Sequence, residues 1–175
     1  MLDFFATVRH RHSVRSYHAD LPVEPEKLHA ILEAACAAPS AGDLQAYRIV
    51  VVNRQSERNA LRRIANDQAF ISEAPISLVF CAEPRRSAER FGERGAHLYA
   101  LQDATIAAAY AQLAIVAAGL GSTWVGYFDE AELVRLLELD EGVVPVALLS
   151  IGYPAELPDP TGRRPMGEVV SYRGD

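Results

Sequence analysis

The residues with the clearest chemical potential lie in one short basic stretch, residues 9–17. Arg11 and Arg15 can each present several N–H donors in a planar fork, and Ser13 can add a hydroxyl, a combination that suits the oxygens of a phosphate group. A solvated basic turn would have the same composition. The choice of arginine over lysine is weak evidence for a binding site here, because Lys27 is the only lysine among the 17 Lys and Arg residues of the chain. The stretch therefore predicts an anion site only if other parts of the chain support it.

A second polar stretch, residues 39–45, combines proline, serine, glycine and aspartate in the pattern of a turn. It leads directly into the β-branched run of residues 47–52, which is typical of a buried strand. Loops positioned by a rigid core element often carry binding residues. We therefore treat residues 39–45 as a second candidate binding segment.

The bulk composition limits the classes of function that this chain can perform. Its 175 residues, half of them hydrophobic, are enough for a sizeable core, and we expect a single domain over residues 1–175. The formal net charge of −6 argues against a nucleic-acid partner or an anionic membrane surface. A small anionic ligand at a local arginine cluster remains compatible with that charge.

Cysteine patterns and targeting signals are weak in this sequence. Cys36 and Cys81 lie far apart among apolar neighbours, so we expect two buried thiols and neither a disulfide nor a metal site. The longest apolar run, residues 104–120, is interrupted by Gln112 and is shorter than the roughly 20 residues that a membrane span needs. Together with an N-terminus that lacks a hydrophobic leader, this predicts a cytoplasmic protein with no membrane partner.

Apolar runs rich in β-branched residues predict the strands. The clearest runs are residues 47–52, 76–82, 122–128 and 144–151, and residues 168–172 are a further candidate. Apart from Arg48 and Ser77, the first two runs are apolar, which is typical of a sheet covered on both faces. The order of elements therefore predicts an α/β fold with a central sheet between helical layers.

Apolar periodicity and capping residues predict the helices, which cover residues 2–8, 25–39, 54–66 and 104–118. A last helix begins at Asp129, where Glu132 completes a capping-box-like arrangement. Asp103 is expected to cap the helix over residues 104–118, in which eight of fifteen residues are alanine. That helix is apolar nearly all round, which indicates a buried core helix or a contact with a second subunit. The charged residues 85–95 are expected to form a mobile excursion.

Several blocks of this sequence together resemble the nitroreductase family of FMN-dependent oxidoreductases. The two flavin-contacting segments of that family are matched by Arg11-His12-Ser13-Val14-Arg15 and by Ala38-Pro39-Ser40-Ala41-Gly42-Asp43-Leu44-Gln45. Later blocks follow in the family's order, namely Gln102-Asp103-Ala104, residues 119–126, residues 151–155 and the pair Arg163-Arg164. The resemblance covers nearly the whole chain. It implies a three-layer fold, a central mixed sheet covered by helices, and a homodimer.

The resemblance also implies roles for particular residues. It assigns the FMN phosphate to Arg11, His12, Ser13, Arg163 and Arg164, and the pyrimidine side of the flavin to Arg15. It implies that the flavin is packed from the other subunit of the homodimer by Pro39, Ser40, Ala41, Asp43 and Gln45. The redox edge near flavin N5 would be covered by the backbone of Trp124, Val125, Gly126 and Tyr127. Gln68, from a region that aligns loosely, is a further candidate for a hydrogen bond to the ring.

A flavin accepts a hydride at N5 and passes it on, so the resemblance implies neither a catalytic side chain nor a metal ion. Arg15 near N1 would favour the anionic reduced flavin and raise its reduction potential. Asp43 opposes this effect, because family members usually carry asparagine there. Its carboxylate must therefore be paired, protonated or turned away from the ring. Tyr47, where the family often has tryptophan, is expected to serve core packing.

The function expected from these features is an FMN-dependent oxidoreductase. It would pass a hydride from NADH or NADPH through flavin N5 to a small electrophilic acceptor, such as a nitroaromatic or a quinone, by a ping-pong mechanism. One alternative is a specialised flavin dehydrogenase or dehalogenase of the same family. Another is a protein that stores or senses FMN without turnover, which Asp43 and the short charged excursion would support.

Overall fold

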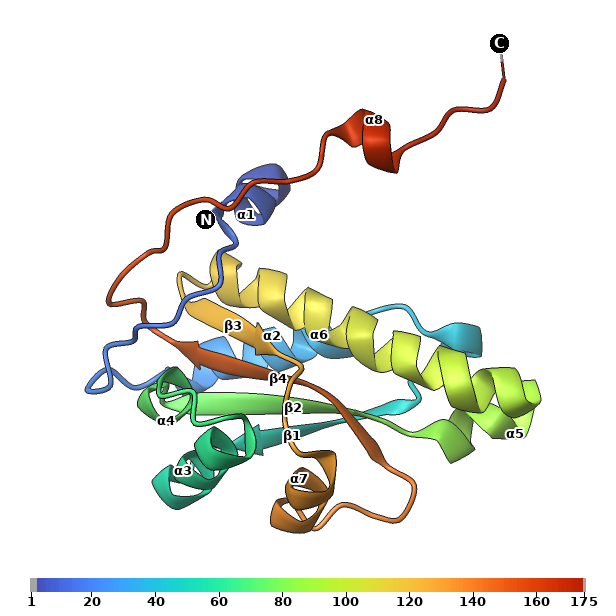
Figure 1. Cartoon of the computed structure of the whole chain (residues 1–175), viewed down its shortest axis with the longest axis horizontal. Coiled ribbons are helices and arrows are strands. Elements are labelled where there is room, and N and C mark those ends of the chain that lie inside the picture. The colour runs from blue at the N-terminus through green and yellow to red at the C-terminus, as the bar shows by residue number, and fades with distance from the viewer. Residues whose placement is uncertain (1–2, 175) are drawn as a thin grey trace.

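Four strands form the middle layer of the fold, and the computed structural model describes residues 3–174 of the chain (Figure 1). The strands are β1 (Tyr47–Val52), β2 (Ile76–Ala82), β3 (Gly121–Val125) and β4 (Val144–Gly152). They lie in the order β1-β2-β4-β3, and each neighbouring pair is antiparallel. The bounds of β1 and β2 match the predicted strands.

The α/β class is confirmed, but the strand directions differ from the expected mixed sheet. Parallel pairing is confined, within the described residues, to an isolated bridge between Ser13 and Ser122, where the N-terminal segment runs beside β3. The physical reason is that strand direction depends on which strands become neighbours. The sequence of a single strand does not contain that information.

The inner strand β2 is buried on both faces, as its apolar sequence predicts, whereas the edge strand β1 is mostly half-buried. Along β2, Leu78 and Phe80 pack into one hydrophobic cluster, while Val79 and Cys81 pack into the other. This alternation follows from the two-residue period of a strand. Burial raises the pKa of the Cys81 thiol to about 12, so this cysteine is an unreactive core residue.

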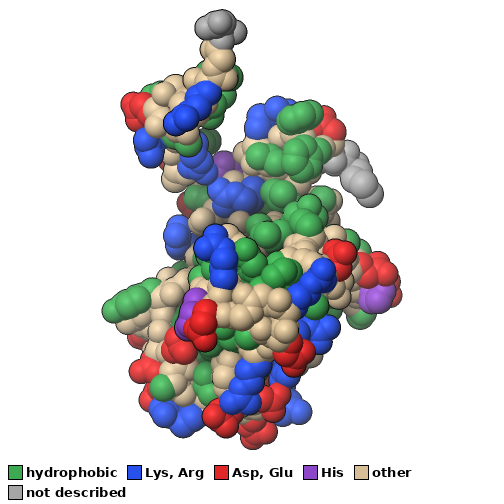
Figure 2. Space-filling view, turned by 90° about the vertical axis from the view of Figure 1, so that its right-hand side faces the viewer, with side chains coloured by type: hydrophobic (Ala, Val, Ile, Leu, Met, Phe, Trp, Pro, Cys, Tyr) green, Lys and Arg blue, Asp and Glu red, His purple; other side chains and the backbone are tan. Residues whose placement is uncertain are grey.

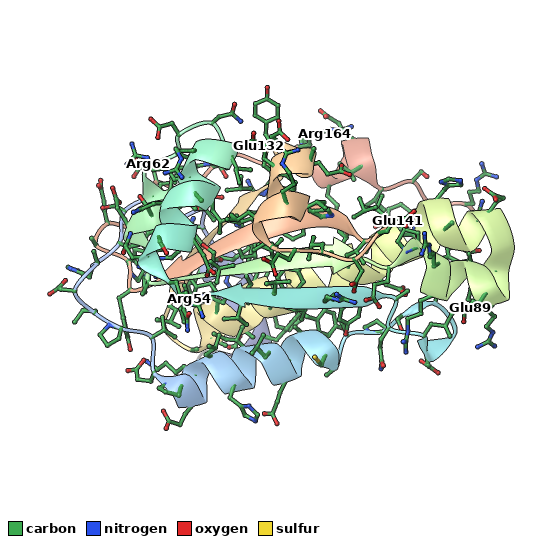
Figure 3. All side chains as sticks on the ribbon, turned by 90° about the horizontal axis from the view of Figure 1, so that it is seen from below. Arg54, Arg62, Glu89, Glu132, Glu141 and Arg164 are labelled. Carbon is green, nitrogen blue, oxygen red and sulfur yellow. The ribbon has the colours of Figure 1, made fainter. Side chains whose placement is uncertain are left out.

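Helices cover the two faces of the sheet (Figure 3). One face carries α2 (Pro25–Cys36) and α6 (Ala100–Ala117), and the other carries α3 (Gln55–Ile64), α4 (Phe70–Glu73) and α7 (Glu130–Leu136). The short helix α1 (Phe4–His10) lies against α6 and is capped by Asp3, whose carboxylate accepts a hydrogen bond from Ala6 N. The predicted start of this helix at Leu2 lies outside the described residues.

Helix α6 is a core helix, as its alanine-rich sequence predicts. Its small side chains let it pack closely on β2 and β4, and Ala104, Ala107, Ala108 and Ala111 are fully buried. By length and apolar composition alone, the helical stretch Pro84–Ala117 could cross a membrane, but half of its apolar window is buried inside the fold. Packing on the sheet accounts for the buried half of this apolar surface.

The expected mobile excursion at residues 85–95 is wrong. These residues form α5 (Pro84–Arg94), and a π-helical turn, η2 (Gly95–Tyr99), joins it to α6. A Cβ at Gly95 would lie 2.4 Å from Ser87 O, so glycine permits the close packing of α5 on this turn. The charged side chains of this stretch face solvent, whereas Ser87 and Gly95 are buried. The high content of charged residues therefore did not indicate that one side of the stretch packs against the fold.

Three smaller expectations also need correction. Asp103 does not cap α6, because the helix begins earlier, at Ala100, through the π turn. Cys36 is exposed, because it lies in the last turn of α2. The candidate strand at residues 168–172 contains the end of a short helix, α8 (Met166–Val169), in a tail whose side chains are exposed and lie beside no strand of the sheet.

Candidate functional site

The N-terminal segment, residues 11–15, lies along the edge of the sheet. Val14 N donates a hydrogen bond to Ser122 O at 3.0 Å, and Val14 is buried. The Tyr17 hydroxyl donates to Val14 O at 2.7 Å and lies 2.8 Å from Ser150 Oγ, and burial raises its pKa to about 12. These buried anchors tie the backbone to the sheet, while Arg15 between them is exposed.

A small hollow of about 110 Å³ lies beside this segment. It is lined by Arg11, His12, Ser13 and Arg15 together with Pro158, Asp159 and Thr161 of the tail. The hollow therefore contains the three residues predicted for an anion site, Arg11, Ser13 and Arg15, together with His12. Segments about 150 residues apart in the sequence meet here.

The tail arginines only partly join this group. Arg163 Nη1 donates hydrogen bonds to Thr161 Oγ1 at 2.6 Å and to Thr161 O at 3.1 Å. Arg164 instead donates to Glu168 O at 2.9 Å and pairs with the Glu168 carboxylate at 3.5 Å. Neither guanidinium lines the hollow, although Arg163 holds a residue that does.

The turn segment, residues 39–45, lies at the opposite corner of the sheet. It precedes β1 at one edge, whereas residues 11–15 run beside β3 at the other edge (Figure 1). The two segments also lie at opposite ends of the strands. Tyr47 pairs with Ala82, which pairs with Val144 at the start of β4, whereas Ser122 pairs with Ile151 near the end of β4. At about 3.3 Å per residue and about 4.8 Å between strands, the corners are roughly 20 Å or more apart. One chain does not bring its two candidate segments together.

The turn segment is held from two sides. Beneath it, the buried Asp103 carboxylate accepts hydrogen bonds from Ala41 N and Ala46 N. Above it, Arg90 Nη1 donates to Gly42 O at 2.9 Å and Arg86 Nε donates to Leu44 O at 2.5 Å. Figure 2 looks onto this end of the molecule, where basic and acidic side chains are interspersed.

Asp43 projects from the turn segment into solvent. Its residue is exposed, and within residues 3–174 its carboxylate makes no hydrogen bond and no ion pair. Of the three arrangements expected for this carboxylate, the structure thus excludes pairing within one described chain. Tyr47 is half-buried and its hydroxyl donates to Ala35 O, in line with the expected packing role.

The predicted redox-edge segment follows the end of β3. Trp124 is half-buried and Val125 is buried, whereas Gly126 and Tyr127 are exposed. Asn66 Nδ2 donates to Tyr127 O at 3.4 Å and ties this segment to the loop after α3. Gln68, the predicted ring contact in that loop, uses its amide nitrogen to donate to Ala65 O at 2.9 Å.

Comparison with known proteins identifies the family. A sequence model of the Nitroreductase family matches residues 8–83 and 65–153. This chain belongs to the nitroreductase family. A Thermus thermophilus protein named NADH dehydrogenase is 34% identical to it over 200 aligned residues, covering 99% of this chain and 97% of the relative. A Vibrio harveyi NADPH-flavin oxidoreductase is 30% identical, covering 94% of this chain and 71% of the relative.

Solved structures share the same architecture. The Vibrio harveyi NADPH:FMN oxidoreductase, solved as a complex with NAD+, matches this nitroreductase chain with a TM-score of 0.89 at 29% identity, covering 98% of this chain and 77% of that one. Bacillus megaterium NfrA2 matches with a TM-score of 0.90 at 29% identity, covering 100% and 77%. The three-layer fold predicted from the family resemblance is therefore confirmed.

The donor set of this nitroreductase chain fits a phosphate group at the N-terminal segment. Two guanidinium groups and a hydroxyl converge there, and neither Arg11 nor Arg15 pairs with a carboxylate within residues 3–174. The volume of the hollow suits a phosphate, so the ring system of FMN would lie outside it. Asp159 is the exception, because a carboxylate in the lining repels an anion.

Sequence reasoning missed four residues that shape these segments, namely Asn66, Arg86, Arg90 and Asp103 as a buried hydrogen-bond acceptor. The arginines lay in the charged stretch expected to be mobile. One feature of the sequence could have indicated the role of Asp103. Its carboxylate directly precedes the predicted helix over residues 104–118, which is apolar nearly all round, so it would need a buried hydrogen-bond partner.

Proposed function

We propose that this nitroreductase-family chain is a cytoplasmic FMN-dependent oxidoreductase that uses NADH or NADPH to reduce a small electrophilic acceptor, such as a nitroaromatic or a quinone. The observation that carries the proposal is the convergence of Arg11, Ser13 and Arg15 on a phosphate-sized hollow. Relatives named FMN reductase and NADPH-flavin oxidoreductase support it. The proposal treats residues 1–175 as a single FMN-binding domain.

In the proposed site, Arg11, His12 and Ser13 would bind the phosphate, while Arg15 would reach the pyrimidine side of the ring. Trp124 to Tyr127 would shield the reacting edge with backbone, and Arg163 would hold Thr161 in the lining. When bound, FMN supplies the hydride acceptor and donor. The chain's own residues supply binding, orientation and charge.

A second copy of the chain would complete each site. One chain holds residues 11–15 and 39–45 at opposite corners of its sheet, so a partner must bring its turn segment to the flavin. An apolar groove of about 490 Å³ between α1, α2 and α6, lined by residues that include Phe4, Tyr110 and Leu113, offers a surface for that partner. Phe4 and Phe5 are 66% and 70% exposed in the single chain. Exposure of two adjacent aromatic rings to water is unfavourable, and a dimer contact would bury them.

The test of this proposal is the purified protein itself. We expect it to be yellow and to release FMN, not FAD, on boiling. Steady-state oxidation of NADH or NADPH with a quinone or nitroaromatic should give parallel double-reciprocal lines, because one cleft over the flavin serves both substrates in turn. A colourless protein that FMN cannot reconstitute would contradict the proposal. FMN binding without turnover would instead support the storage or sensor alternative.

Asp43→Asn is expected to raise the reduction potential of the bound flavin. The Asp43 carboxylate is exposed and unpaired within the described chain, so near the ring it would disfavour added negative charge. Asparagine tolerates the positive φ of 56° at this position, so the turn should survive. Equilibrium redox titration measures the potential, with Asp20→Asn, an exposed site outside both segments, as the control. An unchanged potential with lower thermal stability would show that Asp43 only stabilises the turn.

A further inference from the structure

The turn segment passes through the left-handed region of backbone conformation at three positions. Gly42, Asp43 and Gln45 have φ values of 59°, 56° and 47°. Glycine adopts this left-handed region freely and aspartate adopts it more readily than most residues, whereas Gln45 stays there only where surrounding contacts hold it. A hydrogen bond from Gln45 N to Ser40 Oγ at 2.9 Å closes the turn internally. Within the segment, Asp43 N also donates to Ser40 O and Leu44 N donates to Ala41 O, each at 3.2 Å. Further stabilisation comes from outside the segment.

Asp103 of α6 supplies that external contact. Its Oδ1 accepts a hydrogen bond from Ala41 N at 2.9 Å, and its Oδ2 accepts one from Ala46 N at 3.3 Å. A single carboxylate therefore fixes both ends of the strained stretch. Asp103 is 2% exposed and Ala46 is fully buried, so water cannot readily replace these bonds.

The charge of Asp103 strengthens this arrangement. Within residues 3–174, no cationic side chain forms an ion pair with it, so the two backbone amides are the partners that compensate its burial. Bonds from N–H groups to an ionised acceptor are roughly twice as strong as neutral ones. A buried carboxylate that lost them would be severely destabilised. The shape of the turn segment and the burial of Asp103 therefore depend on each other.

The contacts on the outer side of the segment are weaker. Arg86 and Arg90 of α5 donate to Leu44 O and Gly42 O, but both side chains are exposed. Exposed polar contacts of long side chains contribute little, because water competes for the same donors and acceptors. The buried bonds to Asp103 are therefore stronger external contacts than those to Arg86 and Arg90.

We infer that Asp103 is a positioning residue of the flavin site, which holds residues 41–46 in the shape that packs against the flavin ring. The inference rests on the proposed function, because that function assigns the turn segment to the flavin. Asp103 acts through the two backbone amides and touches neither cofactor nor substrate.

Asp103→Asn tests this role with almost no change in volume. Asparagine offers one acceptor oxygen and turns an N–H toward the other amide, so one bond is lost and one repulsive contact appears. We expect the FMN dissociation constant to rise roughly fivefold, since a net hydrogen bond contributes about 1 kcal/mol. The circular dichroism of bound FMN in the visible region should also change. A purely structural role would lower the thermal midpoint but leave both readouts of the folded protein unchanged, and that result would overturn the inference.

Asp129→Asn is the matched control. Asp129 also accepts a backbone hydrogen bond, from Glu132 N at 2.9 Å, but at the start of α7. Asparagine caps helices as well as aspartate does, so FMN affinity should not change. An equal loss of affinity in both variants would overturn the inference.

The wild-type chain provides a second measurement in case Asp103→Asn does not fold. Hydrogen exchange of the half-buried Ala41 amide should be slow both before and after FMN is added, because Asp103 already holds it. Fast exchange before addition would overturn the inference. Failure of the wild-type chain to bind FMN would overturn the proposed function itself, whereas normal wild-type binding with unchanged Asp103→Asn affinity would overturn only the role of Asp103.

Discussion

Arg11→Ala is expected to weaken FMN binding at least about tenfold. Arg11 is half-buried, lines the small hollow beside Ser13, and pairs with no carboxylate within the described residues. A charge-assisted hydrogen bond to a phosphate contributes roughly 1.5 to 3 kcal/mol, and about 1.4 kcal/mol corresponds to a tenfold change in affinity. Titration of the FMN-free protein with FMN, followed by the quenching of flavin fluorescence, measures this effect.

Arg9→Ala is the matched control for that prediction. Arg9 lies two residues away, in the last turn of α1, where it is exposed and does not line the hollow. The two variants lose the same charge from the same region, so a long-range electrostatic effect would weaken binding equally in both. Equal losses, or no loss in Arg11→Ala, would contradict the assignment of this hollow to the phosphate.

Mixed dimers of Arg11→Ala and Ser40→Trp are expected to recover about half of the normal flavin content. Each homodimer should bind FMN poorly, because one lacks a phosphate contact and the other blocks the ring face. In a dimer with shared sites, a mixed pair places both defects in one site and leaves the other intact. Differently tagged chains, unfolded and refolded together, allow the mixed dimer to be isolated and its flavin to be measured.

The control for this experiment pairs Arg11→Ala with Ser13→Trp. Both changes then lie in residues 11–15, so every site of the mixed dimer carries one defect and recovers no flavin. If each chain built a complete site by itself, the Arg11→Ala and Ser40→Trp pair would also fail to recover flavin. That result, in a folded mixed dimer, would rule out the shared site while leaving FMN binding intact.

Local sequence determined much of the secondary structure. The strands at residues 47–52 and 76–82 have the predicted bounds, and the helix over residues 55–64 lies inside its predicted range. Side-chain periodicity and turn residues act over a few neighbouring positions, so they can be read from one segment at a time. The ordered blocks of residues that resemble the nitroreductase family were equally readable, and they led to the correct family and fold.

The tertiary structure decided what depends on residues distant in sequence. It made the four strands antiparallel, ordered residues 84–99 by packing Gly95 on Ser87, and placed Asp103 beneath a turn about 60 residues earlier. It also placed the two candidate flavin segments at opposite corners of one sheet. Strand order, buried polar partners and close helix contacts arise from the packing of the whole chain, because their energies come from neighbours that no local window contains. The sequence by itself thus provided the candidate residues of a flavin site, and only the fold revealed that one chain holds the two candidate segments apart.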